Sequence, residues 1–123
     1  MLKNIFLATA LATAVFSEEI PQYLYKVLSL EDWKASQSQS EVQLAPSDQD
    51  FIHFSKEDQV ERIVTKYWNG SSYVLLKIDS ACLPGDLVFE ANPGGSGKYY
   101  HLYNGSIPMQ CVVESKIVKK GYR

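Results

Sequence analysis

The spacing of hydrophobic and polar residues predicts helices early in the chain and strands through most of its second half. Residues 23–28 are rich in aromatic and branched side chains, which is typical of a strand. Ser29 is a suitable N-cap for a helix that continues to about Ser38. The pattern also allows a short strand at residues 42–44, followed by a turn over residues 46–48.

A second helix is expected after the strand that contains His53, because the apolar spacing changes there from that of a strand to that of a helix. Ser55 is a good N-cap, so the pattern predicts a helix over residues 55–68 that stops at Asn69-Gly70. Four apolar residues spaced i, i+3, i+4 and i+7 form one stripe of this helix. They are Val60, Ile63, Val64 and Tyr67.

The remaining apolar segments predict strands separated by turns. Residues 73–79 are nearly continuous in apolar side chains, as in a central strand. Shorter strands are expected at residues 87–90 and 98–103, joined by a glycine-rich loop, and an alternating segment predicts a last strand at residues 110–118. The pattern as a whole predicts an α+β fold: one compact domain with two early helices against a mostly antiparallel, split sheet.

The first residues have the pattern of an export signal. Lys3 is followed by an apolar run over residues 5–16, which has the length of a signal-peptide core and is short for a membrane span. We therefore expect cleavage after residues 1–17, an exported (periplasmic or secreted) domain over residues 23–118, and a short tail over residues 119–123. No stable membrane anchor is expected after cleavage. The alternative is a buried N-terminal helix in a cytoplasmic protein.

Two cysteines, Cys82 and Cys111, remain after the expected cleavage. In an oxidising compartment they can form a disulfide, and otherwise they can be two separate buried thiols. Their pairing depends on a distance that the sequence does not give. The oligomeric state is likewise not determined by the sequence, and a monomer is the simplest expectation.

Size and charge limit the classes of function. A chain of 123 residues with 46% hydrophobic residues is long enough for one domain core. Its 12 basic and 14 acidic residues are balanced and form no basic run, so we expect no extended nucleic-acid surface. A small pocket for one nucleotide is compatible with this charge.

The candidate site residues are polar side chains within or next to the predicted strands. The chain has two histidines, His53 and His101, each inside an apolar or aromatic strand, and Glu90 ends another strand. A histidine in such a position is often a structural hydrogen-bonding group, so structural and functional roles both stay open. No metal site is expected, because these three residues lack the short spacing that is typical of metal ligands.

Several short segments occur in an order that resembles a known family. They are Leu24-Tyr25-Lys26-Val27, Phe51-Ile52-His53-Phe54-Ser55, the helix near Val60, Val74-Leu75-Leu76-Lys77-Ile78-Asp79, Phe89-Glu90 and His101-Leu102-Tyr103. The family is the set of small bacterial proteins called domain of unknown function 952, and the resemblance covers residues 23–118. It implies a compact relative of the ADP-ribosyltransferase fold, near the RNA 2'-phosphotransferases. It also implies NAD as a candidate substrate, with no tightly bound cofactor.

The resemblance implies a role for each candidate residue. Glu90 would stabilise the positive charge that builds up on the ribose when its bond to nicotinamide breaks. His53 and His101 would hydrogen-bond ribose hydroxyls or a phosphate, and these three residues are the catalytic candidates. Four further residues are assigned to ligand binding: Tyr25, Lys26, Ser55 and Tyr103.

Two functions are therefore in view. The first is a small nucleotide-binding domain, with NAD cleavage or ADP-ribosyl transfer as its candidate activity. The alternative is a non-enzymatic exported binding or interaction domain that keeps the fold without catalysis. The arrangement of His53, Glu90, His101 and Tyr103 separates them, because catalysis by this set requires that the side chains share one cleft.

Overall fold

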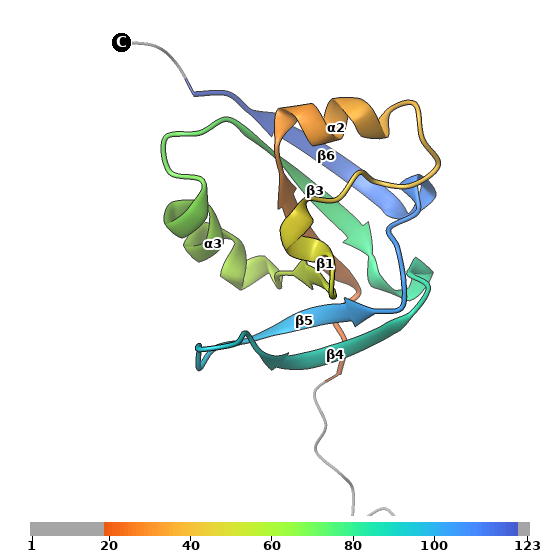
Figure 1. Ribbon diagram of the computed structural model, residues 1–123, viewed down its shortest axis with the longest axis vertical. Coiled ribbons are helices and arrows are strands. Elements are labelled where there is room, and N and C mark those ends of the chain that lie inside the picture. Colours follow the sequence, from red (N-terminus) through yellow and green to blue (C-terminus); the bar gives the residue numbers. More distant parts are fainter. Residues whose placement is uncertain (1–18, 121–123) are drawn as a thin grey trace, which may run out of the picture.

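Two three-stranded antiparallel sheets form the framework of the protein, in a computed structural model that describes residues 19–120 (Figure 1). The expected signal segment, residues 1–17, lies outside the described residues. The first sheet has the order β1-β3-β6, with β1 at Tyr23–Leu28, β3 at Tyr73–Asp79 and β6 at Val112–Val118. The second has the order β2-β5-β4, with β2 at Ile52–Phe54, β5 at Lys98–Tyr103 and β4 at Asp86–Ala91.

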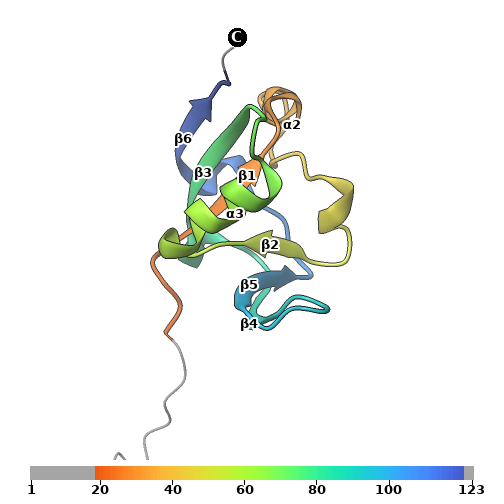
Figure 2. The ribbon, with the colours of Figure 1, turned by 90° about the vertical axis from the view of Figure 1, so that its left-hand side faces the viewer.

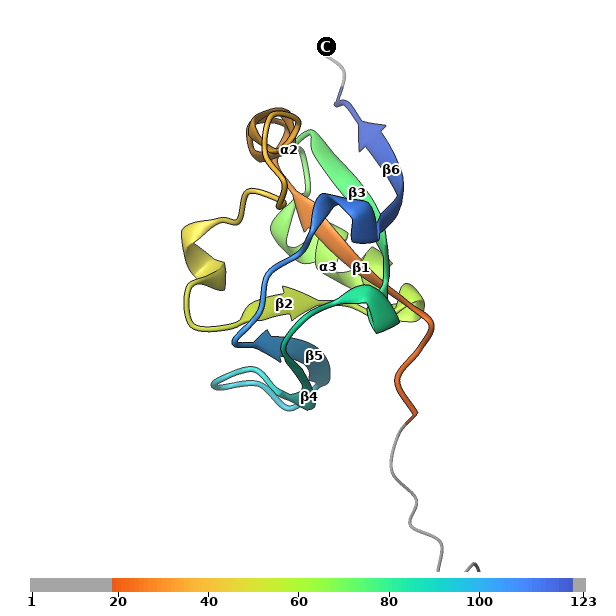
Figure 3. The ribbon, with the colours of Figure 1, turned by 90° about the vertical axis from the view of Figure 1, so that its right-hand side faces the viewer.

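Two α-helices accompany the sheets: α2 at Leu30–Ser36 and α3 at Val60–Tyr67. Figures 2 and 3 show α3 beside β1 and β3, with α2 at the end of the molecule away from the second sheet. Neither helix, nor any other within residues 19–120, has the length and apolar character needed to cross a membrane. Short 3-10 helices occur at Pro46–Asp48, Glu57–Gln59, Ser80–Cys82 and Met109–Cys111.

The core lies between the two sheets and follows from the alternation along their strands. Every second residue of β1 and β3 is buried, which directs one face of the first sheet inward. The second sheet presents its own apolar face to the same core. The inward residues include Leu24, Leu28, Val74, Leu76, Ile78, Ile52, Phe54, Tyr100 and Leu102. The prediction of an α+β domain with two helices and a split antiparallel sheet is confirmed.

The first helix begins as predicted, and Ser36 determines where it ends. The backbone N–H of Asp32 donates to Ser29 Oγ at 3.0 Å, which is the expected cap. Ser36 is buried, and its hydroxyl donates to Asp32 O at 2.7 Å while accepting from Gln43 N–H at 2.8 Å. These bonds attach the end of α2 to the following loop, so the helix stops before Ser38.

The expected cap at Ser55 is wrong. Ser55 pairs with Tyr25 in a β-bridge, in which each backbone N–H donates to the other residue's carbonyl at 2.8 Å. The helical segment instead begins after Lys56, whose N–H donates to Gln59 Oε1 at 2.9 Å, and it passes through a 3-10 turn before α3. The free edge of β1 supplies two backbone partners, and this tertiary pairing outweighs the local capping preference.

Two strand predictions also need correction. Residues 42–44 form no strand, although Val42 N–H donates to Ile107 O at 2.8 Å. The last strand starts at Val112, because residues Met109–Cys111 form a 3-10 turn. The register between β3 and β6 also shifts at Lys77/Ile78, which breaks the simple alternation expected for β6.

The two cysteines form a disulfide, with an S–S distance of 1.99 Å. Cys82 lies in the turn that follows β3, where the chain leaves the first sheet for the second. Cys111 lies in the turn that precedes β6, where the chain returns. The disulfide therefore joins two of the crossings between the sheets, the one after β3 and the one before β6, while the Tyr25–Ser55 bridge joins β1 to the segment that follows β2.

Removing the disulfide is expected to lower the free energy of unfolding by about 3 kcal/mol, because it closes a loop with a sequence separation of 29. Denaturant unfolding of the Cys82→Ala/Cys111→Ala variant measures this loss. Reductant should destabilise the wild type by a similar amount and leave the variant unchanged. Equal stability of the wild type and the variant would contradict the prediction.

Candidate functional site

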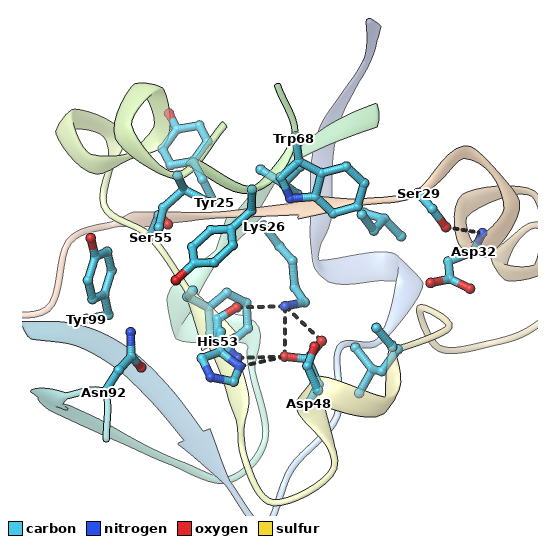
Figure 4. Close-up of a pocket in the computed structure, with 18 of the residues that line it drawn as sticks. Tyr25, Lys26, Ser29, Asp32, Asp48, His53, Ser55, Trp68, Asn92 and Tyr99 are labelled. Carbon is cyan, nitrogen blue, oxygen red and sulfur yellow. Dashed lines mark hydrogen bonds and ion pairs between the residues drawn. The ribbon is translucent and has the colours of Figure 1, made fainter. Parts of the chain in front are cut away.

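A cavity of 460 Å³ opens beside the free edge of β1 (Figure 4). This volume lies within the usual range for small-molecule sites. Its walls come from β1, the segment before β2, the end of α3 and the turn between β4 and β5. The Tyr25–Ser55 bridge joins this edge to the segment after β2, and residues 26–28 beyond the bridge line the cavity. The lining includes Tyr25, Lys26, Asp48, His53, Trp68 and Tyr99.

Lys26 enters this cavity from the inward face of β1, between Leu24 and Leu28. Its ammonium lies 3.0 and 3.1 Å from the two carboxylate oxygens of Asp48 and donates to His53 O at 2.8 Å. These three acceptors match the three N–H groups of a lysine ammonium. Burial lowers the pKa of Lys26, while the charge of Asp48 opposes this change.

Asp48 connects Lys26 to His53. Its Oδ1 accepts from the backbone N–H of His53 at 3.0 Å and lies 2.9 Å from His53 Nδ1 (Figure 4). Burial alone would raise the pKa of Asp48. The hydrogen bonds from His53 and the charge of Lys26 outweigh burial and lower this pKa to about 2. The carboxylate is therefore ionised near neutral pH and acts only as an acceptor.

An ionised Asp48 fixes the tautomer of His53. The neutral ring must carry its proton on Nδ1 to donate to Asp48, which leaves the Nε2 lone pair as an acceptor. The His53 side chain is 39% exposed and lines the cavity. Within residues 19–120, no protein group bonds to Nε2. The cavity thus contains an oriented imidazole that can accept a hydrogen bond or a proton from a ligand hydroxyl.

Glu90, His101 and Tyr103 form a second cluster, which does not line the cavity. Glu90 Oε2 accepts from the Tyr103 hydroxyl and lies 2.8 Å from His101 Nδ1. The hydrogen bond from Tyr103 lowers the pKa of Glu90, and the same bond raises the pKa of Tyr103. His101 is fully buried, and the ring of Phe51 stacks on it with centroids 4.1 Å apart.

The two clusters are neighbours across the second sheet. His53 and His101 are direct partners in β2 and β5, and their ring centroids lie 5.3 Å apart. Asn92 lines the cavity and places its Oδ1 2.7 Å from His101 Nε2. The structure therefore divides the candidate residues into two groups that meet at Asn92 and the histidine pair. The group that lines the cavity is Tyr25, Lys26, His53 and Ser55.

The sequence pattern did not indicate Asp48, the residue that orients His53, or the wall residues Asn92, Trp68 and Tyr99. One feature of the sequence did indicate an acidic partner. Lys26 occupies an inward position of β1, and a buried ammonium needs an anion beside it. It did not indicate which of the 14 acidic residues is that partner. Ser55, which the resemblance assigns to ligand binding, lines the cavity, but its backbone N–H is bonded to Tyr25.

The fold and the cavity define a small α+β domain with a pocket built around the buried Lys26–Asp48 pair and the partly exposed His53. The chain belongs to the family described as protein of unknown function (DUF952), whose sequence model matches residues 27–115. This confirms the resemblance to that family. A search of curated proteins finds no match.

Solved structures of one bacterial protein are similar to this chain. The crystal structure of protein CC0527 from Caulobacter crescentus has 30% sequence identity and a TM-score of 0.67, covering 77% of this chain and 84% of that chain. Its solution NMR structure has 29% identity and the same TM-score of 0.67, covering 78% and 84% of the two chains. The names of these structures state no activity or ligand.

Acid is expected to remove the stability that Asp48 contributes. Its pKa falls from 3.8 to about 2 on folding, so the contribution is present above about pH 4 and is lost as the pH falls toward 2.

Asp48→Asn should lower the free energy of unfolding by about 3 kcal/mol at neutral pH, because Lys26 is left buried without its anion. Urea unfolding across this pH range measures both effects. The exposed neighbour Asp50, changed to Asn, is the control; equal losses in the two variants would refute this role of Asp48.

Proposed function

We propose that the pocket binds a nucleotide-type small molecule, with NAD as the candidate substrate. The observation that carries the proposal is the oriented His53 ring, whose Nε2 lone pair is available inside a cavity of 460 Å³. A ribose hydroxyl is a suitable donor to this atom. Hydrogen bonds of this kind fix the orientation of a ligand within a pocket that is otherwise largely apolar.

Aromatic side chains support a ligand with a flat ring. Tyr25 comes from β1, Trp68 follows α3, and Tyr99 comes from β5, so three separate elements bring rings to the cavity (Figure 4). Aromatic rings pack well on flat heterocycles such as a base or a nicotinamide. This combination of aromatic faces with a hydrogen-bond acceptor suits a nucleoside better than it suits a simple sugar or a lipid.

The free edge of β1 supports recognition of an amide. Tyr25 uses its N–H and C=O for Ser55 on the side of β1 away from β3. Because backbone groups alternate along a strand, Val27 directs its N–H and C=O to that same side, and Val27 lines the cavity. A carboxamide or the edge of a base can form paired hydrogen bonds with these two groups.

The charges of the residues that line the pocket favour the nucleoside part of a nucleotide there over its phosphate groups. Among the described residues that line it, Lys26 is the one lysine or arginine, and its three donors already have acceptors. Asp32 and Asp48 add negative charge to the lining. Phosphate groups of a bound nucleotide would therefore extend toward solvent, while the base and ribose occupy the pocket.

The candidate activity is NAD cleavage or ADP-ribosyl transfer, as the resemblance to an ADP-ribosyltransferase-like fold implies. The resemblance assigns Glu90 the stabilisation of the developing charge on the ribose, with His53 and His101 as its partners, but His53 lines the cavity and the other two do not. The binding-domain alternative has support of its own. Glu90 lies outside the cavity lining, and its Oε2 is already engaged by His101 and Tyr103.

Export is part of the proposal. The Cys82–Cys111 disulfide supports it, because structural disulfides are typical of oxidising compartments such as the periplasm or the cell exterior. The expected partner there is a nucleotide-like small molecule, with no extended nucleic-acid surface and no stable membrane anchor.

Isothermal titration tests the binding step. We expect the purified protein to bind at least one of NAD, ADP-ribose and 2'-phosphorylated RNA ends. His53→Ala should weaken this binding about tenfold, because it removes a hydrogen bond made inside the pocket. Glu61→Gln, a change on the exposed side of α3, is the control. If the wild type binds none of the three ligands, the proposal fails.

A second experiment separates enzyme from binding domain. Hydrolysis of NAD is followed by release of nicotinamide, with wild type and Glu90→Gln compared at saturating substrate. If the protein is an enzyme, loss of the carboxylate should lower the turnover at least a hundredfold while binding persists. Unchanged properties in Glu90→Gln, apart from stability, would support the binding-domain alternative. Circular dichroism establishes that the variant is folded.

A further inference from the structure

The outer edge of the first sheet is formed by β6, which lies opposite to β1 in the order β1-β3-β6. Residues 113–117 are all exposed along this strand. Two of them are large apolar residues: Val113 is 49% exposed and Ile117 is 53% exposed. An exposed edge with apolar side chains can pair with another strand, because its outward backbone groups lack strand partners.

The hydrogen-bond pattern shows which groups of β6 face outward. At the opposite edge of the sheet, Tyr25 directs its N–H and C=O away from β3. Because these groups alternate in direction along a strand, the next residue, Lys26, directs its own toward β3 and bonds to its partner Leu76. By the same alternation, Leu75 bonds to its partner Lys116 in β6. Ser115 and Ile117, the neighbours of Lys116, therefore direct their N–H and C=O groups away from β3.

The sequence of β6 is complementary to itself in the antiparallel direction. It reads Val-Val-Glu-Ser-Lys-Ile-Val over Val112–Val118. If two copies pair about a two-fold axis at Ser115, Glu114 of each copy faces Lys116 of the other. The same register brings Val113 of each copy next to Ile117 of the other, at the end of the regular ladder, because the register shift between β3 and β6 falls at Val113. Opposite charges and apolar pairs are the favourable combinations for residues directly across an antiparallel ladder.

We propose that β6 is an interface with a second copy of this chain, in which two β6 strands pair about Ser115 to form a continuous six-stranded sheet. The outward N–H and C=O groups of Ser115 bond to those of its counterpart. Because Glu114 and Lys116 flank Ser115 symmetrically, the Glu114–Lys116 pair is made twice in the dimer. A slip of the register would place like charges or charged and apolar residues across from each other.

The charges also explain why this edge is selective. Charged side chains on an edge strand generally prevent pairing with unrelated strands. Here one acid and one base lie two residues apart, so they disfavour most partners and match an identical strand. The interface also leaves the cavity accessible, since the cavity lies at β1, the opposite edge of the same sheet. The inference is therefore independent of the proposed ligand.

Charge reversal tests the pairing. Sedimentation velocity of the purified protein, over a wide range of concentration, should show a concentration-dependent dimer for the wild type. Glu114→Lys and Lys116→Glu should each weaken self-association about tenfold or more, because each places like charges across both positions of the two-fold pair. The double variant Glu114→Lys/Lys116→Glu restores opposite charges and should associate like the wild type.

Mixing the two single variants gives the sharpest result. Glu114→Lys and Lys116→Glu are each disfavoured as homodimers, but together they place Lys opposite Glu at both positions, so an equimolar mixture should form a heterodimer. Glu61→Lys, the same charge reversal on exposed α3, should leave the association unchanged. A monomeric wild type at every concentration would overturn the proposal, and so would single variants that dimerise as well as the wild type.

Discussion

Asp48 accepts hydrogen bonds from the buried ammonium of Lys26 and from the ring and backbone of His53, and the rest of the pocket depends on this carboxylate. It neutralises a lysine that β1 turns inward, and it holds the 3-10 turn Pro46–Asp48 against β2. It also sets the tautomer of His53. One ion pair thus links the stability of the domain to the orientation of its principal polar group.

Strand and helix positions were largely predictable, because the alternation of β1 and β3 and the stripe of α3 are strong periodic signals. The errors lie where tertiary pairing supplied partners that the local sequence does not reveal. Ser55 has the chemistry of a helix cap, yet its backbone pairs with Tyr25. Val42 is an apolar residue suited to a strand, yet it packs in the core outside any strand, with its backbone N–H bonded to Ile107 O.

The site was only partly predictable. His53 and His101 stand out as polar residues in apolar strands, and the register of β2 and β5 places them side by side. That register depends on pairing between segments almost fifty residues apart, which periodicity does not encode. For the same reason the sequence did not separate Glu90 and Tyr103 from the cavity, or identify Asp48 as the partner of Lys26. Contacts between distant segments decide which of several similar carboxylates pairs with Lys26 and His53.

The disulfide has a consequence for the exposed turn between β4 and β5. Residues 93–97 are exposed, and they lie inside the covalent ring that Cys82 and Cys111 close. If a protease cuts the backbone within this turn, the two fragments stay joined through sulfur, and β4 and β5 keep their places beside each other. This turn borders the pocket at Asn92. Because of the ring, cleavage within the turn releases no part of the molecule until a thiol reductant breaks the disulfide.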